Sequence, residues 1–143
     1  MIRKMQYNWI KGGKIRQIHA LWLSSKLARR YGIFVSPDIN IGLGLKLPHP
    51  NGIIIGKGCD IGENCTIFQQ VTIGSARNGD FLLGKQPHIL NDVCLFASCK
   101  VIGDITVYNN CTIGANSVLL TDADEGGTYV GSPARKIETK SKV

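Results

Sequence analysis

The chain carries a branched aliphatic residue at every sixth position over long stretches. Between residues 89 and 119 these are Ile89, Leu95, Val101, Val107, Ile113 and Leu119. Upstream the same spacing holds for Val35, Ile41 and Leu47 and, after a slip of two residues, for Ile55, Ile61, Ile67 and Ile73. A period of six matches neither an α-helix nor one long strand, so it indicates a structural repeat.

Each six-residue unit is also predicted to contain a tight turn. Gly, Asn or Asp stands three residues after many of the aliphatic residues, at Asp38, Gly44, Gly58, Asn64, Asp92, Asp104, Asn110 and Asn116. These residue types adopt positive φ at the lowest cost. A unit therefore reads as one short strand and one turn, and three units close a triangular coil with the aliphatic side chains inside. Equivalent strands then stack about 4.8 Å apart, which predicts an all-β chain folded as a parallel β-helix.

Four of the five cysteines occupy one position of this repeat. We call the aliphatic residues spaced by six the ladder aliphatics. Four residues after a ladder aliphatic stand Cys59, Cys65, Cys99 and Cys111, and in other units Val71, Val93, Ile105 and Ser117. We expect buried free thiols that act as small apolar side chains. The spacing favours neither a zinc site nor a disulfide framework, and nothing beside Cys94 in the sequence marks it as a nucleophile. Free thiols fit a reducing, cytoplasmic location.

The composition predicts one globular unit and lacks the pattern typical of a nucleic-acid-binding protein. The 143 residues are 43% hydrophobic, which is enough chain for a core. The net charge is +7, with basic residues at both ends, but only 7% of residues are aromatic. The charge suits a phosphate-bearing small ligand or an anionic surface, or it is an ordinary solvated face. No uninterrupted apolar stretch near the start is long enough for a signal peptide or a membrane span.

The chain divides into four segments. Residues 14–31 predict an amphipathic helix that stops at Gly32 and places Ile15, Ile18, Trp22 and, more loosely, Leu23 and Leu27 on one side. The expected divisions are a helical segment over 1–32, the β-helix over 33–121 with an excursion at 75–87, and a C-terminal loop and tail over 122–143. A peripheral contact between the helix and a membrane stays open.

Two interruptions of the repeat each carry a histidine. His49 lies between two prolines in the slip, and His88 follows the excursion directly. Interruptions of a repeat scaffold form loops on its surface, where function is concentrated. A single loop histidine is more often structural, but its position at a break makes each of these a candidate site residue.

Three motifs resemble the left-handed β-helix hexapeptide acyltransferases, in particular the serine-acetyltransferase-like branch. They are residues 41–56, which include Leu47-Pro48-His49-Pro50-Asn51-Gly52, then residues 68–74, and finally Gly131-Ser132-Pro133-Ala134-Arg135. The resemblance covers roughly residues 35 to 137. It implies a left-handed coil, against the usual right-handed rule for parallel crossovers, and an assembly of three chains with active sites between neighbours.

By this resemblance the reaction is transfer of an acetyl group from acetyl-CoA to a hydroxyl, without a metal. His49 matches the catalytic histidine, which as a neutral imidazole accepts the proton of the attacking alcohol. Gly74 and Ala97 match positions near the pantetheine arm of CoA, and Gly131, Arg135 and Lys136 match the segment near its nucleotide end. The expected acceptor-binding residues are Asn51, Gln69, Lys85, Gln86 and His88.

Departures from the serine-specific pattern shift the expected acceptor to a saccharide. Pro48 and Phe34 stand where those enzymes carry aspartates, and Lys85-Gln86 replaces an Arg-His pair. A zwitterionic amino acid needs charged partners, whereas sugar hydroxyls are neutral. We therefore expect a saccharide O-acetyltransferase of capsule, O-antigen or exopolysaccharide synthesis, with L-serine as the alternative acceptor. A zinc hydrase or a non-catalytic assembly module on the same coil also stays open.

Overall fold

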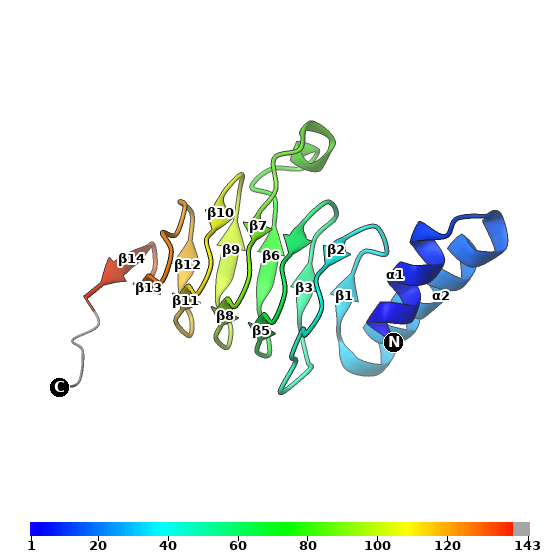
Figure 1. The fold of residues 1–143 in the computed structure, drawn as a ribbon, viewed down its shortest axis with the longest axis horizontal. Helices are drawn as coiled ribbons and strands as arrows, with labels where there is room; N and C mark the ends of the chain where they lie inside the picture. The colour runs from blue at the N-terminus through cyan, green and yellow to red at the C-terminus, as the bar shows by residue number, and fades with distance from the viewer. Residues whose placement is uncertain (139–143) are drawn as a thin grey trace.

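Three β-sheets form the sides of a prism in the computed structural model, which describes residues 1–138 (Figure 1). Sheet A contains β1 (Phe34–Val35), β3 (Ile54–Ile55), β6 (Thr72–Gly74), β9 (Lys100–Ile102) and β12 (Val118–Leu119). Sheet B contains β2 (Asn40–Ile41), β4 (Asp60–Ile61), β7 (His88–Ile89) and β10 (Thr106–Val107). Sheet C contains β5 (Thr66–Ile67), β8 (Cys94–Leu95), β11 (Thr112–Ile113), β13 (Thr128–Gly131) and β14 (Ala134–Ile137).

The strand register confirms the eighteen-residue coil. Ile55 pairs with Ile73, and Val101 pairs with Leu119, each pair separated by 18 residues. The ladder aliphatics point inward and are at most 3% exposed, except Leu47, which is only partly buried in its loop. Val35 and Ile55 are 20 residues apart, and Ile73 and Val101 are 28 apart, so the two interruptions insert two and ten residues.

The corner turns follow the predicted positions in most coils. Positive φ occurs at Gly44, Gly58, Asn64, Asp92, Asn110 and Asn116. Asp38 and Asp104 were expected to share this conformation and do not; Gly103 takes it beside Asp104. Gln70 and Ser98 adopt φ of 59° and 61° at the same slot, although neither residue type favours it. Residue type alone therefore does not decide which turns adopt positive φ.

Four of the five cysteines are buried inside the prism, as predicted. Cys59, Cys65, Cys99 and Cys111 are fully buried, while Cys94 is half-buried on the outer side of β8. Burial raises the pKa of the Cys59 and Cys99 thiols to about 12. These thiols stay neutral at ordinary pH, because their charged form would lose its hydration.

Two helices precede the prism and form a hairpin. The helix α2 (Lys14–Tyr31) has the predicted bounds and ends at Gly32 with φ 62°; α1 (Ile2–Ile10) is an additional helix. The predicted apolar side of α2 was wrong in part, because Leu23 and Leu27 are buried but the other three residues are not. Its buried stripe runs through Ala20, Leu23 and Leu27, at i, i+3 and i+7, whereas Ile15, Ile18 and Trp22 lie exposed on another side.

The helical hairpin closes the first edge of the prism. The Gln6 amide donates to the Ile39 carbonyl at 3.2 Å, and the Arg3 guanidinium donates to the carbonyls of Ile41 and Gly42. The Ser24 hydroxyl donates to the Val35 carbonyl at 2.8 Å. These side chains satisfy backbone acceptors that no earlier coil covers.

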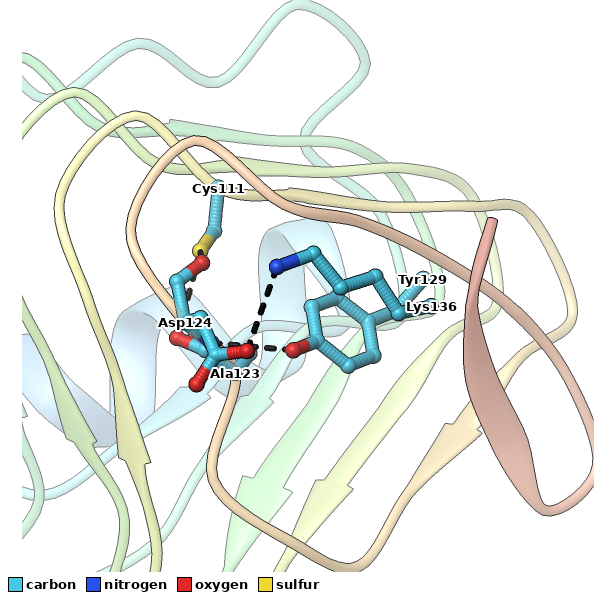
Figure 2. A network of polar contacts seen from close by, with 5 residues as sticks. All are labelled: Cys111, Ala123, Asp124, Tyr129 and Lys136. Atoms are coloured by element: carbon cyan, nitrogen blue, oxygen red, sulfur yellow. Dashed lines mark hydrogen bonds and ion pairs between the residues drawn. The ribbon is translucent and has the colours of Figure 1, made fainter. Parts of the chain in front are cut away.

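An antiparallel strand covers the end of sheet C at the opposite end of the prism. Residues 122–138 were expected to be loop, but they include β13 and β14, which pair antiparallel at the end of sheet C. Figure 2 shows how this end is fastened: the Cys111 thiol donates to the carbonyls of Ala123 and Asp124, and the Asp124 N–H donates to the Tyr129 hydroxyl at 2.9 Å. The rest of the predicted tail, residues 139–143, lies outside the described residues.

Candidate active site

His49 lies on an exposed loop where the chain passes from sheet C to sheet A, just before β3. Its carbonyl accepts a hydrogen bond from the Asn51 N–H at 2.8 Å, which closes the loop tightly. Its ring packs against Phe68 at 6.3 Å between centroids, and Phe68 stacks on Phe96 at 5.1 Å. An aromatic column along one corner therefore supports the imidazole.

No acidic side chain orients this imidazole within residues 1–138. Neither ring nitrogen of His49 has a hydrogen-bond partner there, so both are available to a ligand. Phe34, at the position of an expected aspartate, is 56% exposed and pairs with Ile54 on the outer face of sheet A. At this position the structure therefore places an exposed aromatic side chain rather than a carboxylate.

Polar groups surround the same corner on the next coils. The Gln70 N–H donates to the Asn51 carbonyl at 2.9 Å, and the Ser98 N–H donates to the Gln69 carbonyl at 2.9 Å. The Ser98 hydroxyl donates to the Gln70 side-chain oxygen at 2.7 Å. The side-chain oxygen of Gln69 is buried without a partner among the described residues. A buried amide oxygen of this kind is a ready acceptor for a ligand hydroxyl or ammonium.

The second group of predicted site residues lies at the corner between sheets A and B. The excursion contains a short 3-10 helix, Asp80–Leu83, and returns through exposed Lys85 and buried Gln86. Gln86 is 9% exposed, and its side-chain oxygen also lacks a partner within residues 1–138. The Gln86 amide lies against Gly58, where a β-carbon would approach it to 3.1 Å, so glycine makes room for it.

His88 has a partner that the sequence analysis missed. Its Nδ1 lies 2.9 Å from Oδ2 of Asp60 on the neighbouring strand, on the outer face of sheet B. A sequence signal for this pair exists, because both residues directly precede a ladder aliphatic, Ile61 and Ile89. The ten-residue insertion hides the match, since the pair is 28 residues apart rather than 18.

One chain does not bring the two groups of residues together. The His49 loop enters β3, while the excursion leaves β6, and these adjacent strands of sheet A are parallel. In Figure 1 the loop before β3 lies at the lower end of the strands, and the excursion rises from the upper end. His49, Asn51 and Gln69 therefore gather at one corner, and Lys85, Gln86 and His88 at another.

The residues expected to contact CoA are open to solvent but dispersed. Gly74 begins the excursion, and no atom lies within 4 Å of where its β-carbon would be. Ala97 is half-buried on the corner that carries Gln69. Gly131 and Arg135 lie exposed on β13 and β14. Lys136 is exposed but pairs with Asp124 at 3.2 Å (Figure 2), and this hydrogen bond raises the pKa of its ammonium group.

The described residues contain no group of three or more His, Cys, Asp or Glu side chains placed to hold a metal ion. His49 and His88 lie at different corners, and His19 lies in the helical hairpin beside Asn8.

Comparison with known proteins identifies serine acetyltransferases among the relatives of this chain. No family model matches the chain. A serine acetyltransferase of Helicobacter pylori is 41% identical over 114 residues, which are 79% of this chain and 66% of the relative. A serine acetyltransferase of Bacillus subtilis is 37% identical over 121 residues, which are 84% of this chain and 55% of the relative. The chain thus spans between about half and two thirds of the length of these relatives.

Solved structures agree over almost the whole chain. The serine acetyltransferase of Neisseria gonorrhoeae superposes with a TM-score of 0.85 and 28% identity, covering 99% of this chain and 54% of that one. A serine acetyltransferase in complex with CoA gives a TM-score of 0.82 and 31% identity, covering 95% of this chain and 53% of that one. The left-handed coil implied by the resemblance is confirmed. The chain therefore belongs to the hexapeptide-repeat acyltransferases with a left-handed β-helix, in the branch that contains the serine acetyltransferases.

Proposed function

We propose that the protein transfers an acetyl group from acetyl-CoA to the hydroxyl of a small acceptor, with His49 as the general base. The observation that carries this proposal is the exposed His49 imidazole, held on the aromatic column with both ring nitrogens available, at a break of a serine-acetyltransferase-like prism. The buried thiols support direct transfer to the acceptor, because neutral Cys59 and Cys99 are poor nucleophiles.

In this mechanism His49 accepts one proton and later returns it. The acceptor oxygen attacks the thioester carbonyl carbon while its proton passes to a ring nitrogen of His49. This attack forms the new C–O bond and an oxyanion. The tetrahedral intermediate then collapses, restoring the carbonyl and breaking the C–S bond. His49 returns the proton to the departing sulfur, so that CoA leaves as a thiol and the imidazole is neutral again.

L-serine is the acceptor that the comparisons favour over the saccharide expected from the sequence. The relatives are named serine acetyltransferases, at up to 41% identity. The saccharide remains a second candidate because of one observation: Pro48 and Phe34 leave no carboxylate on His49 within the described residues, while Gln69 and Gln86 offer unpartnered amide oxygens. Exposed Lys85 is the cation that would pair with the carboxylate of serine.

Replacing His49 tests the proposal. We expect His49→Ala to lower kcat by about 10² to 10⁴ while CoA affinity, measured by calorimetry, stays close to that of the unmodified protein. Acetyl-CoA consumption is followed with L-serine and, in parallel, with a panel of sugars, so the same assay identifies the acceptor. His19→Gln, in the helical hairpin, is the matched control and should keep full activity. Near-normal turnover by a folded His49→Ala variant would remove His49 as the base.

We also propose that the working site lies between neighbouring copies in a homotrimer. The support is the separation of the His49 corner from the Gln86 corner within one chain. Joining a corner of one copy to the other corner of the next would unite the two groups around one acceptor, and a closed ring repeats that contact.

Mixed oligomers test the shared site. His49→Ala and Gln86→Leu should each impair a homo-oligomer, because each of its sites lacks one native group. Co-expressed chains should regain activity, since some interfaces then join a native His49 to a native Gln86. Light scattering should give about three chains per particle. An active monomer, or mixed oligomers verified by mass spectrometry that recover nothing, would contradict the shared site.

A further inference from the structure

The helix α2 has two apolar sides, and only one of them packs on the protein. Ala20, Leu23 and Leu27 are buried against the prism and α1. On another side, Ile15, Ile18, Leu21 and Trp22 are 83%, 65%, 53% and 50% exposed. Their spacing of three and four residues places them along one stripe of the helix. We call these four residues the outer stripe; Ile10, 76% exposed, ends α1 at the nearby hairpin turn.

The helical hairpin also holds the positive charge of the whole protein. Residues 1–37 contain eight of the 17 Lys and Arg residues and none of the ten Asp and Glu residues, which gives a net charge of +8. The remainder of the chain has a net charge of −1. The basic residues are Arg3, Lys4, Lys11, Lys14, Arg16, Lys26, Arg29 and Arg30.

These basic side chains have no acidic partner among the described residues, and at least one of them lies beside the outer stripe. None of the eight forms an ion pair within residues 1–138, and Arg3 alone is committed to the prism edge. The Lys26 ammonium lies 4.9 Å from the centre of the Trp22 ring, and Lys11 lies 5.9 Å from that of Tyr7. Apolar and cationic groups are therefore presented together on one surface.

The chemistry of this surface selects among possible partners. A second copy would bring a hairpin of the same +8 charge against it, and the prism is close to neutral, so neither complements it. A single-stranded nucleic acid needs aromatic platforms for its bases, whereas three of the four stripe residues are aliphatic. A bilayer with anionic lipids offers both a hydrocarbon boundary for Ile and Leu and negative headgroups for Lys and Arg.

We propose that the outer stripe of α2 binds the surface of membranes that contain anionic lipids. The helix lies in the interfacial plane, with Ile15, Ile18, Leu21 and Trp22 below the headgroups and Lys14, Lys26 and Arg29 among them. The contact is peripheral: across residues 1–138, the structure shows no helix with the length and apolar character needed to traverse a bilayer. This inference does not depend on the acetyl-transfer chemistry.

Vesicle sedimentation with the full chain tests the proposal. We expect the protein to sediment with vesicles of phosphatidylcholine and phosphatidylglycerol, but not with phosphatidylcholine alone, and to be released by high salt. The double variant Ile15→Ser/Ile18→Ser should bind at least about tenfold more weakly, because two large apolar side chains no longer reach hydrocarbon. Trp22 fluorescence, in a Trp9→Phe background, should shift to the blue on binding and lose that shift in the double variant.

The matched control changes exposed apolar residues elsewhere. Leu43→Ser/Leu82→Ser alters side chains that are 69% and 76% exposed on the prism and the excursion, and it should sediment like the unmodified protein. Circular dichroism verifies that both double variants are folded. Equal binding by the two double variants, or no binding to anionic vesicles, overturns the proposal. A change in the number of chains per particle only for Ile15→Ser/Ile18→Ser would instead make the stripe a contact between copies.

Discussion

The prism and the helical hairpin use the same aliphatic residues in opposite ways. In the prism every ladder aliphatic except Leu47 is at most 3% exposed, and each coil repeats the arrangement of the previous one. In α2 the aliphatic residues occupy two sides, and Ile15 and Ile18 remain exposed. In the prism, the strict period determines whether each side chain points inward. In a helix with two apolar sides, the elements that pack against the helix determine which side is buried. Aliphatic content alone therefore does not distinguish core from surface.

A matched pair of isoleucine truncations measures this contrast. The difference in unfolding free energy between the two variants should be the largest effect. Ile67→Ala empties a fully buried position of the prism and should lower the free energy of unfolding by about 2 to 5 kcal/mol. Ile18→Ala removes a side chain that is 65% exposed and should change it by no more than about 0.5 kcal/mol. Urea unfolding at one fixed protein concentration compares the two, because assembly makes stability depend on concentration. A large loss for Ile18→Ala would mean that the outer stripe is covered in the native assembly.

An alkaline titration should give a smaller and more gradual effect that is confined to the prism. Burial raises the pKa of Cys59 and Cys99 to about 12, whereas an unfolded thiol ionises near about 8.5. Their contribution to stability is therefore complete below about pH 8.5 and is lost as the pH rises toward 12, since only the unfolded chain releases these protons early. The helical hairpin contains no cysteine and has no such dependence.

Thermal unfolding from neutral to alkaline pH checks this expectation. The melting temperature of the unmodified protein should fall more steeply above pH 8.5 than that of Cys59→Ala/Cys99→Ala. Lys and Tyr titrate in both proteins and cancel in the comparison. Parallel curves would show that the two thiols ionise in the folded state as easily as in the unfolded one.

The sequence predicted the prism well because its signal is periodic. One six-residue period predicts the ladder aliphatics, the buried cysteines and most of the turn positions. The positive φ of Gln70 and Ser98 was not predicted, because neither residue type favours that conformation. The hand of the coil came only from resemblance, since a period carries no chirality. The end of α2 followed from Gly32, whereas only Leu23 and Leu27 of its predicted apolar side are buried.

The candidate site was harder to predict, because its residues belong to the interruptions. The position of His49 in a break was visible in the sequence, while its aromatic support by Phe68 and Phe96 needed the register of three coils. The contact between Asp60 and His88 was hidden by the inserted excursion. The separation of the two corners appears only in three dimensions, and it supports the site between copies that the resemblance implies.

Closed ends give the prism a defined length. An open parallel ladder would present unpaired backbone groups, and another chain could add to it as a further coil. Here Arg3, Gln6 and Ser24 occupy one edge, and β14 turns back along the other. These features cover part of each end and make end-to-end stacking into fibres less favourable. The stack has room to gain or lose whole coils only in its middle, where each coil touches just its two neighbours, so a lineage of such proteins is free to vary in length while both ends stay the same.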